Sequence, residues 1–335
     1  MMNGMTQADK KEIVKKMGLG IVVFAAAITT IVLLLTPIEG HGESGNYVPG
    51  EPEGLIEEDG VRYVPKRNIE AYLFMGIDNP GKVEKVTEYT GQGRCDVILL
   101  LVRDLSTGTY KTLQLNRNLL MEQDSLEPDG TYIGTSTAIL ALAHENGDGM
   151  EISCENVVKA VSHFLGGCRI DGYAALNMGA IASINHLAGG VTVTIEDDFS
   201  QVDSSLVQGE TITLSDEQAV NFVHSRWYVD DESNESRMRR QTVYMTDLKR
   251  RLRHKCAEDK EYPLTIYEGL EEYMVTDITA QKFSKIALLM LEDRDEGELV
   301  IEGTSIQNDL GYMEMTADRD SVKKACLELF YREYD

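Results

Sequence analysis

The sequence predicts an α/β fold with a central mixed β-sheet flanked by helices, preceded by one transmembrane helix and followed by a small helical extension. Two continuous apolar runs, residues 71–77 (AYLFMGI) and 95–104 (CDVILLLVRD), are typical of buried strands. Stretches with helical periodicity follow these runs along the chain. The segment Gly18–Leu35 contains no charged residue, which indicates a membrane span.

Composition indicates a globular protein and limits its partners. Of the 335 residues, 42% are apolar and 26% are charged, as expected for a chain that forms a core. An excess of acidic residues, 56 against 32 lysines and arginines, gives a net charge of −24. A field of this sign repels phosphates at long range, so we expect no nucleic-acid partner. Any anionic ligand must therefore be held by a local cluster of cations or through a metal ion.

The N-terminal region predicts a membrane anchor over residues 17–36. At 1.5 Å per residue, Gly18–Leu35 forms about 27 Å of helix, close to the thickness of the bilayer hydrocarbon. A cleaved signal peptide is the alternative, although its apolar part is usually shorter and no small-x-small cleavage pattern follows. Residues 1–16 carry four lysines. We therefore expect a cytoplasmic tail, a single pass through the cell membrane and an extracellular C-terminal domain.

Beyond the anchor, composition divides the chain into three parts. Residues 37–66 are rich in Gly, Glu and Pro, which predicts a stalk or linker. Residues 67–256 carry the α/β pattern. Residues 257–335 contain short helix candidates, such as 279–292 and 321–334, and few strand signals, which predicts a C-terminal helical extension.

Local signals order the elements within residues 67–256. The run 95–104 and the segment 110–116 are separated by a short turn with Gly108, which predicts a hairpin. Ser153 is the expected N-cap of one helix, and Ser215 with Gln218 has the spacing of a capping box. A strand is expected over residues 191–198. The expected helices are residues 137–146, 154–167, 182–190, 215–226 and 235–255.

The cysteines give no sign of a metal or disulfide framework. They are Cys95, Cys154, Cys168, Cys256 and Cys326. An odd number leaves at least one thiol unpaired, and no CxxC pair is present to bind zinc. Cys154 and Cys168 are the closest possible bridge, but small buried apolar residues are the favoured interpretation.

Two carboxylates stand at the ends of predicted strands. Asp78 follows the run 71–77, and Asp96 begins the next run. Side chains at strand ends line the crevice where α/β proteins bind ligands, and paired carboxylates there suit Mg²⁺. Ordinary turn and capping residues are the alternative. The overlapping segment 76–83 (GIDNPGKV) resembles a phosphate loop, but Val83 replaces the hydroxyl that binds magnesium and no helix is expected to follow, which argues against an ATPase.

Arginines near strand ends and in the segment HSRWYVDDESNESRMRRQ are candidate phosphate ligands: Arg94, Arg117, Arg226, Arg237, Arg239 and Arg240. A guanidinium binds phosphate through paired hydrogen bonds and stays charged. Arg237 and Arg240 lie one helical turn apart and so share a face, while Arg239 should point elsewhere. Ion pairing with acidic residues of the same segment is the alternative. His224 is either a general base or a cation at a helix end.

The ordered set of motifs resembles the LytR–CpsA–Psr family of membrane-anchored cell-wall proteins, over about residues 70–250. Residues 76–78 (GID) and 94–96 (RCD) resemble its first acidic motif and its R-S-D block. Residues 97–118 resemble the strand pair that ends in an R-D motif. The middle and last blocks are matched by residues 170–181, 187–195, 214–227 and 236–241, the last two resembling A-x-x-[FY]-V-R-x-R followed by G-R-M-x-R-Q.

The resemblance implies a three-layer catalytic domain over residues 67–256 and a Mg²⁺-dependent phosphotransferase. Such an enzyme moves a glycopolymer, of the teichoic acid or capsular polysaccharide class, from an undecaprenyl pyrophosphate carrier to peptidoglycan outside the membrane. Carried over by position, Asp78 and Asp96 would hold Mg²⁺, and Arg117, Arg226 and Asp96 would be catalytic. The residues expected to bind substrate are Arg94, Arg117, Arg226, Arg237, Arg240 and His224.

Two departures from the family pattern bear on activity. His224 stands where the R-x-R motif has its first arginine, and Asn118 stands where the R-D motif has its aspartate. Losing one charged hydrogen bond costs about 1.5–3 kcal/mol, or roughly ten- to a hundredfold in rate if it is felt in the transition state. The alternatives are therefore a catalytically degenerate protein that binds polyprenyl pyrophosphate or regulates the envelope, and a polyprenyl pyrophosphatase.

Overall fold

The structure, a computed structural model, describes residues 54–91, 93–309, 311 and 313–334. The cytoplasmic tail expected over residues 1–16 and the transmembrane helix expected over residues 17–36 lie outside these residues. Among the helices of the described part, none is both long enough and apolar enough to cross a membrane.

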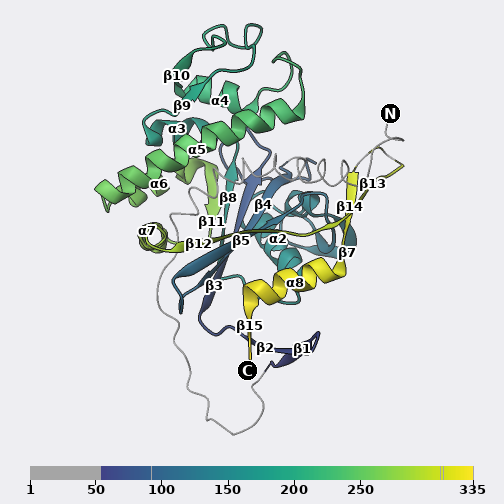
Figure 1. Ribbon diagram of the computed structural model, residues 1–335. Helices are drawn as coiled ribbons and strands as arrows, with labels where there is room; N and C mark the ends of the chain where they lie inside the picture. Colours follow the sequence, from purple (N-terminus) through teal and green to yellow (C-terminus); the bar gives the residue numbers. More distant parts are fainter. Residues whose placement is uncertain (1–53, 92, 310, 312, 335) are drawn as a thin grey trace, which may run out of the picture.

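A six-stranded mixed sheet forms the middle layer of the protein (Figure 1). In sheet order its strands are β11 (Met274–Thr276), β8 (Gly172–Asn177), β3 (Ile69–Ile77), β4 (Cys95–Asp104), β5 (Thr109–Leu115) and β12 (Arg294–Val300). β4 and β5 pair antiparallel and form the predicted hairpin. β3 is antiparallel to β4 and parallel to β8, so the sheet is mixed, as predicted.

Both faces of this sheet are buried, which explains the continuous apolar runs in the sequence. Successive side chains of a strand point to opposite faces. In β3, Tyr72 and Phe74 therefore belong to one core cluster, and Leu73 and Met75 belong to the other. The result is a three-layer arrangement with a hydrophobic core on each side of the sheet.

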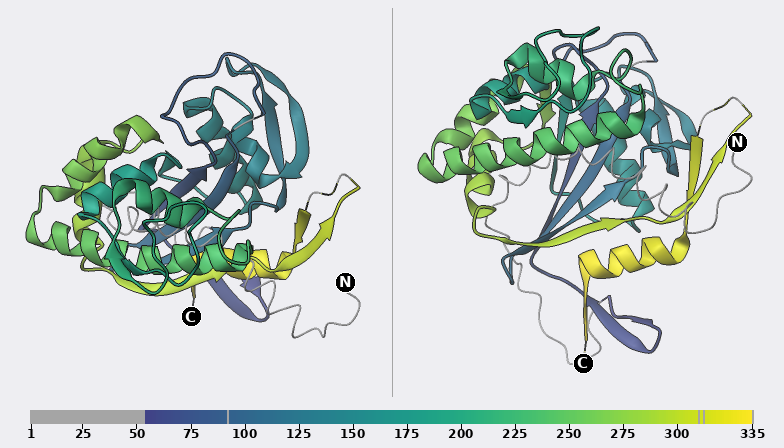
Figure 2. Two further views of the ribbon diagram at one scale, coloured as in Figure 1. Left: turned by 90° about the horizontal axis from the view of Figure 1, so that it is seen from above. Right: turned by 45° about the horizontal axis from the view of Figure 1, so that its top comes forward.

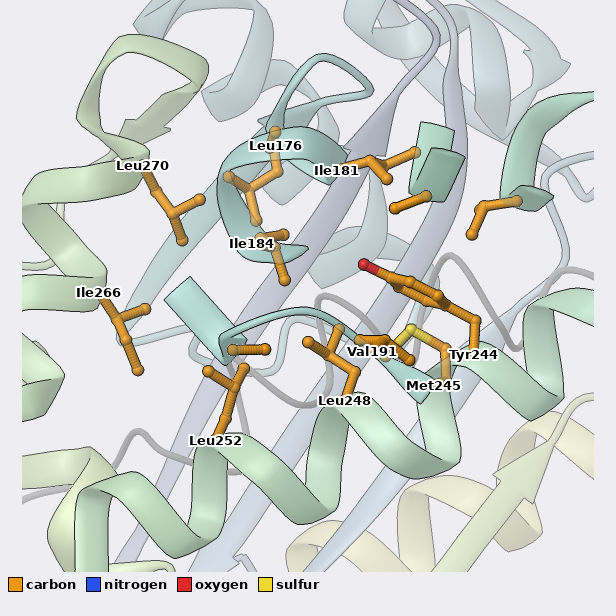
Figure 3. Packing of buried hydrophobic residues seen from close by; sticks show 14 of the residues in the cluster. Leu176, Ile181, Ile184, Val191, Tyr244, Met245, Leu248, Leu252, Ile266 and Leu270 are labelled. Atoms are coloured by element: carbon orange, nitrogen blue, oxygen red, sulfur yellow. The ribbon is translucent and has the colours of Figure 1, made fainter. Parts of the chain in front are cut away.

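The helical layers differ in size. α2 (Glu151–Phe164) and the 3-10 helix η1 (Leu140–Glu145) pack on the Leu73 side, together with α8 (Arg319–Phe330). Figure 2 shows the long helix α5 crossing the other side. In Figure 3, Tyr244, Leu248 and Leu252 of α5 lie near Ile184 and Ile266 of its helical neighbours. The helices of this larger layer are α3 (Ala180–Ala188), α4 (Asp216–His224), α5 (Asn234–Glu258), α6 (Tyr262–Leu270), which continues into the 3-10 helix η2 (Glu271–Tyr273), and α7 (Ala280–Leu289).

The end of the predicted linker is corrected by the structure. Instead of continuing as a stalk to residue 66, the chain forms two antiparallel strands, β1 (Ile56–Glu58) and β2 (Val61–Pro65). β2 also pairs with β15 (Tyr331–Glu333), and Val64 is buried in the contact. The content of Gly, Glu and Pro pointed to a linker. The strand was missed because its partner β15 lies far away in the sequence and leaves no local signal.

The predicted helical extension is also corrected. Residues 257–335 contribute β11 and β12, the two outermost strands of the central sheet, and the hairpin of β13 (Gly303–Gln307) and β14 (Met313–Ala317). Arg103 of β4 and Asp293, just before β12, form an ion pair in which each side chain is only 7% exposed. β12 is polar and largely exposed, so it carries none of the apolar pattern that identifies an inner strand.

Of the predicted helix starts, one is confirmed and one is wrong. The capping box before α4 is confirmed. The backbone N–H of Gln218 donates to Ser215 Oγ at 3.2 Å, and the backbone N–H of Ser215 donates to Gln218 Oε1 at 2.9 Å. The N-cap expected at Ser153 is wrong, because α2 begins two residues earlier. Asp148 Oδ1 instead accepts the N–H groups of Met150 and Ile152, at 2.9 and 3.1 Å.

The helix expected over residues 137–146 is confirmed only over Leu140–Glu145, and there as a 3-10 helix. Residues up to Ile139 belong to β7 (Tyr132–Ile139), which pairs with β6 (Leu120–Leu126), and only η1 is helical. The strand expected over residues 191–198 is shorter, since β9 (Thr192–Thr194) pairs with β10 (Thr211–Thr213). All five cysteines are free and at least half-buried, as the sequence interpretation expected.

Glu70 predicts a pH-dependent contribution to stability. Burial raises the pKa of its carboxyl from about 4.5 to about 7. The folded state thus binds more protons than the unfolded state between these values, and the free energy of unfolding should fall as pH rises from 4.5 through 7. Thermal unfolding of Glu70→Gln in the full chain should show a higher Tm than the wild type at pH 8 and little difference at pH 5. Glu57→Gln, on the exposed edge of β1, is the control; equal Tm shifts at both pH values would contradict the prediction.

Candidate functional site

The two predicted carboxylates meet at one edge of the central sheet. Because β3 and β4 are antiparallel, the end of one strand lies beside the start of the other. The pairing shifts register between Gly76 and Ile77, directly before Asp78. The Asp78 N–H then donates to the Arg94 carbonyl oxygen at 2.9 Å, which holds the two segments together. A shift of this kind re-aims the side chain that follows it, here Asp78.

Arg117 joins this edge from the end of β5. Its guanidinium donates to Asp96 Oδ1, and both side chains are partly exposed. Burial raises the pKa of Asp96, and the positive charge of Arg117 opposes this effect. The neighbouring carboxylate of Asp78 raises the pKa of Asp96 further. Repulsion between these two carboxylates is what a bound cation would relieve.

Arg94 is positioned by a carboxylate that the sequence interpretation missed. Arg94 Nε donates to Glu145 Oε1 at 2.7 Å, and the Glu145 side chain is only 3% exposed. The Tyr89 hydroxyl donates to the other oxygen of Glu145 at 3.0 Å. In the sequence, the only indication of this role for Glu145 was an acidic residue near the end of the apolar run 137–146.

The helical layer brings two further arginines to the same place. Arg226 follows α4, and Arg237 lies in the first turn of α5. Burial lowers the pKa of Arg237, and the neighbouring charges of Arg226 and Arg240 lower it further. The carboxylates of Asp96 and Asp78 act in the opposite direction.

Six predicted residues are thus assembled at one site: Asp78, Arg94, Asp96, Arg117, Arg226 and Arg237. Four of them lie at the ends of β3, β4 and β5, and the two arginines of the helical layer lie close enough to interact electrostatically with the carboxylates. Arginines cluster here in a chain whose net charge is −24, so the site offers the local positive charge that an anionic ligand requires.

Arg240 was predicted to bind substrate, but the structure places its side chain in buried contacts within the protein. Its guanidinium is only 4% exposed, donates from Nε to the Phe222 carbonyl oxygen at 3.0 Å, and also contacts the Ser225 carbonyl oxygen. Both Arg240 and Arg239 pair with Asp197, a buried carboxylate that the sequence interpretation did not single out. Arg240 therefore ties α5 to the end of α4. Helical spacing alone could not reveal the buried acceptor.

His224 ends α4, and its side chain is exposed. This position fits the interpretation of a cation at a helix end, where the helix dipole favours positive charge. The phosphate-loop resemblance receives no support, because the described residues between β3 and β4 form no helix, and Lys82 pairs with Glu272 at 2.6 Å.

The donor set of Asp78 and Asp96 fits Mg²⁺. Among the residues that the structure describes, no group of three or more His, Cys, Asp or Glu side chains is arranged to hold a metal. Mg²⁺ commonly uses one or two carboxylates and completes its shell with waters and substrate phosphates. Two carboxylates beside a cluster of arginines therefore suit Mg²⁺ bound together with a phosphorylated ligand.

Comparisons with known proteins agree with this architecture. The structure of TagV from Bacillus subtilis has a TM-score of 0.54 and 21% identity, covering 79% of this chain and 96% of that chain. Protein gbs0355 from Streptococcus agalactiae has a TM-score of 0.57 and 18% identity, covering 78% and 86%. A structure of TagT bound to LI-WTA has a TM-score of 0.51 and 17% identity, covering 78% and 90%.

No curated protein matches the chain. The family model described as the LytR_cpsA_psr family, however, matches residues 57–326, which is most of the sequence. The chain belongs to the LytR–CpsA–Psr family.

Proposed function

We propose that this protein is a Mg²⁺-dependent phosphotransferase that moves a glycopolymer from an undecaprenyl pyrophosphate carrier to peptidoglycan outside the membrane. Members of the LytR–CpsA–Psr family transfer cell-wall glycopolymers. The observation that carries the proposal is the convergence of Arg94, Arg117, Arg226 and Arg237 on the Asp78–Asp96 edge of the sheet. A pyrophosphate has the charge and the oxygen geometry that such a cluster binds. The proposed polymer is of the teichoic acid or capsular polysaccharide class.

The proposed mechanism relies on positioning and charge neutralisation. The hydroxyl oxygen of the acceptor bonds to the phosphorus next to the glycopolymer, and the bond from that phosphorus to the bridging oxygen breaks. The carrier leaves as polyprenyl phosphate, which takes up the proton lost by the acceptor hydroxyl. Arg117 and Arg226 would stabilise the negative charge that develops, while Arg94 and Arg237 would hold the pyrophosphate. Asp96 orients Arg117 through their ion pair and, with Asp78, would hold Mg²⁺. When bound, Mg²⁺ would neutralise phosphate charge.

The arginines are pre-positioned by the rest of the protein. Arg94 is held by buried Glu145, and Arg226 Nε donates to the Glu232 carbonyl oxygen at 3.0 Å. A guanidinium fixed in this way needs little reorganisation when negative charge develops. This pre-positioning supports an enzyme over a passive binding protein.

Arg237→Ala should weaken binding of undecaprenyl pyrophosphate about ten- to a hundredfold, because one charge-assisted contact is lost. Titration of the lipid into the full-length protein in neutral detergent measures the affinity. Arg250→Ala is the matched control, since Arg250 lies on the same helix but is exposed and pairs with Asp247. Equal affinities for Arg237→Ala and the wild type would argue against a role for Arg237 in pyrophosphate binding.

Asp78→Asn should raise the Mg²⁺ concentration needed for tight pyrophosphate binding by about tenfold or more, since one of two carboxylate ligands loses its charge. The same lipid titration, repeated over a series of Mg²⁺ concentrations, provides the measurement. Asp129→Asn, in an exposed turn, should leave the Mg²⁺ dependence unchanged. Binding that is insensitive to Mg²⁺ in the wild type would contradict the assigned metal site.

Restoring the family residues, His224→Arg with Asn118→Asp, should raise the rate of polymer transfer roughly ten- to a hundredfold if the two departures weaken catalysis. A transfer assay with lipid-linked polymer and isolated peptidoglycan measures the rate. His254→Arg, on the exposed face of α5, controls for added charge. An unchanged rate would mean that the site is fully competent with His224 and Asn118.

A further inference from the structure

The loop between α4 and α5 presents two aromatic rings to solvent beside the arginine cluster. We call residues 225–233 the aromatic loop. Trp227, the only tryptophan of the chain, is 61% exposed, and Tyr228 is 65% exposed. The Arg226 guanidinium lies 4.7 Å from the centre of the Trp227 ring. The exposed rings are thus attached directly to an arginine of the proposed pyrophosphate site.

The backbone of the aromatic loop is held in an unfavourable conformation. Tyr228, Asp230 and Glu232 have φ values of +63°, +46° and +55°, in the left-handed region that favours glycine. Each such residue costs on the order of 1 kcal/mol or more, and persists only when surrounding contacts impose it. Strain of this kind concentrates at binding and catalytic sites, so its presence here calls for a functional explanation.

Specific contacts impose this conformation. Arg240 contacts the Ser225 carbonyl oxygen at the start of the loop, and Val229 is buried, only 1% exposed. The Glu232 side chain accepts the N–H of Tyr228 at 3.0 Å, and its backbone carbonyl accepts from Arg226. Val229 thus anchors the loop in the core while both aromatic rings remain outside. Their exposure is built in, and is not the result of loose packing.

The charges of the loop restrict the partner. Asp230, Asp231 and Glu232 add three exposed acidic residues to the loop, and hydrogen bonds from Ser233 lower the pKa of Asp231 to about 2. An anionic lipid surface and a second copy of this chain, whose net charge is −24, would both be repelled. An uncharged glycan would not be, because its C–H faces stack on aromatic rings and its hydroxyls donate to carboxylates.

We propose that Trp227 and Tyr228 form a stacking surface for the pyranose rings of an uncharged glycan, and that this glycan is the acceptor of the phosphotransfer. The assignment to the acceptor rests on the proposed function, since the rings adjoin Arg226, where a pyrophosphate would lie. Aromatic side chains have few rotatable bonds and lose little entropy when they bind, which suits recognition of a polymer that arrives from solution.

The single tryptophan makes the proposal directly measurable, because emission excited at 295 nm comes from Trp227 alone. Full-length protein in neutral detergent is titrated with chitohexaose, a neutral oligomer of N-acetylglucosamine, with phosphatidylglycerol vesicles and with poly(glycerol phosphate). We expect a saturable change in Trp227 emission with chitohexaose only. No response to chitohexaose, or a response to the vesicles or the anionic polymer alone, would overturn the proposal.

Variants separate stacking from a general effect on the fold. Calorimetry with chitohexaose should give affinity about tenfold weaker for Trp227→Ala and close to wild type for Trp227→Phe, which keeps an aromatic ring. Tyr132→Ala is the matched control, because Tyr132 is 58% exposed on β7. Equal affinity for Trp227→Ala and Tyr132→Ala would contradict the assignment.

Undecaprenyl pyrophosphate is titrated into the same wild-type sample, so that the two proposals are tested separately. Binding of the lipid without any response to chitohexaose would contradict the proposed stacking surface but not the proposed function. A saturable response to chitohexaose without lipid binding would support the stacking surface and contradict the proposed phosphotransfer.

Discussion

The antiparallel pairing of β3 with β4 is the interaction on which the site depends. It brings the end of one apolar strand beside the start of the next, and so places Asp78 and Asp96 together. The β5 hairpin then delivers Arg117 to the same edge. Two hydrophobic cores, one on each face, hold these strands, so the positions of the charged groups are set by packing that lies away from them.

A buried or half-buried carboxylate accompanies most of the guanidiniums. Glu145 holds Arg94, Asp96 holds Arg117, and Asp197 holds Arg239 and Arg240. These pairs need not increase stability, since desolvation of both charges offsets their attraction. Their effect is to fix where each guanidinium lies. An acidic protein can therefore build a positive site, because its own carboxylates orient the arginines as well as neutralise part of their charge.

Much of the fold and of the site could be predicted from local sequence. The run CDVILLLVRD identifies an inner strand, and Ser215 with Gln218 identifies the start of α4, because in both cases the signal is local. Asp78 and Asp96 were found for the same reason, as residues at strand ends. The role of Arg240 was not predictable, because it depends on Asp197, which is distant in sequence and brought close only by the fold. β12 and β15 escaped notice because edge strands owe their place to backbone hydrogen bonds, which leave no side-chain pattern.

The pairing of β2 with β15 has a consequence for how the protein is made. It joins a strand near the start of the α/β region to one that is far away in the sequence, so β2 keeps an open edge until Tyr331–Glu333 has been synthesised. At 5–20 residues per second, the wait is on the order of tens of seconds. Throughout that time the nascent chain exposes a strand edge to other chains. Pairing with β15 therefore protects the edge of β2, and it makes the small sheet β1–β2–β15 depend on segments far apart in the sequence.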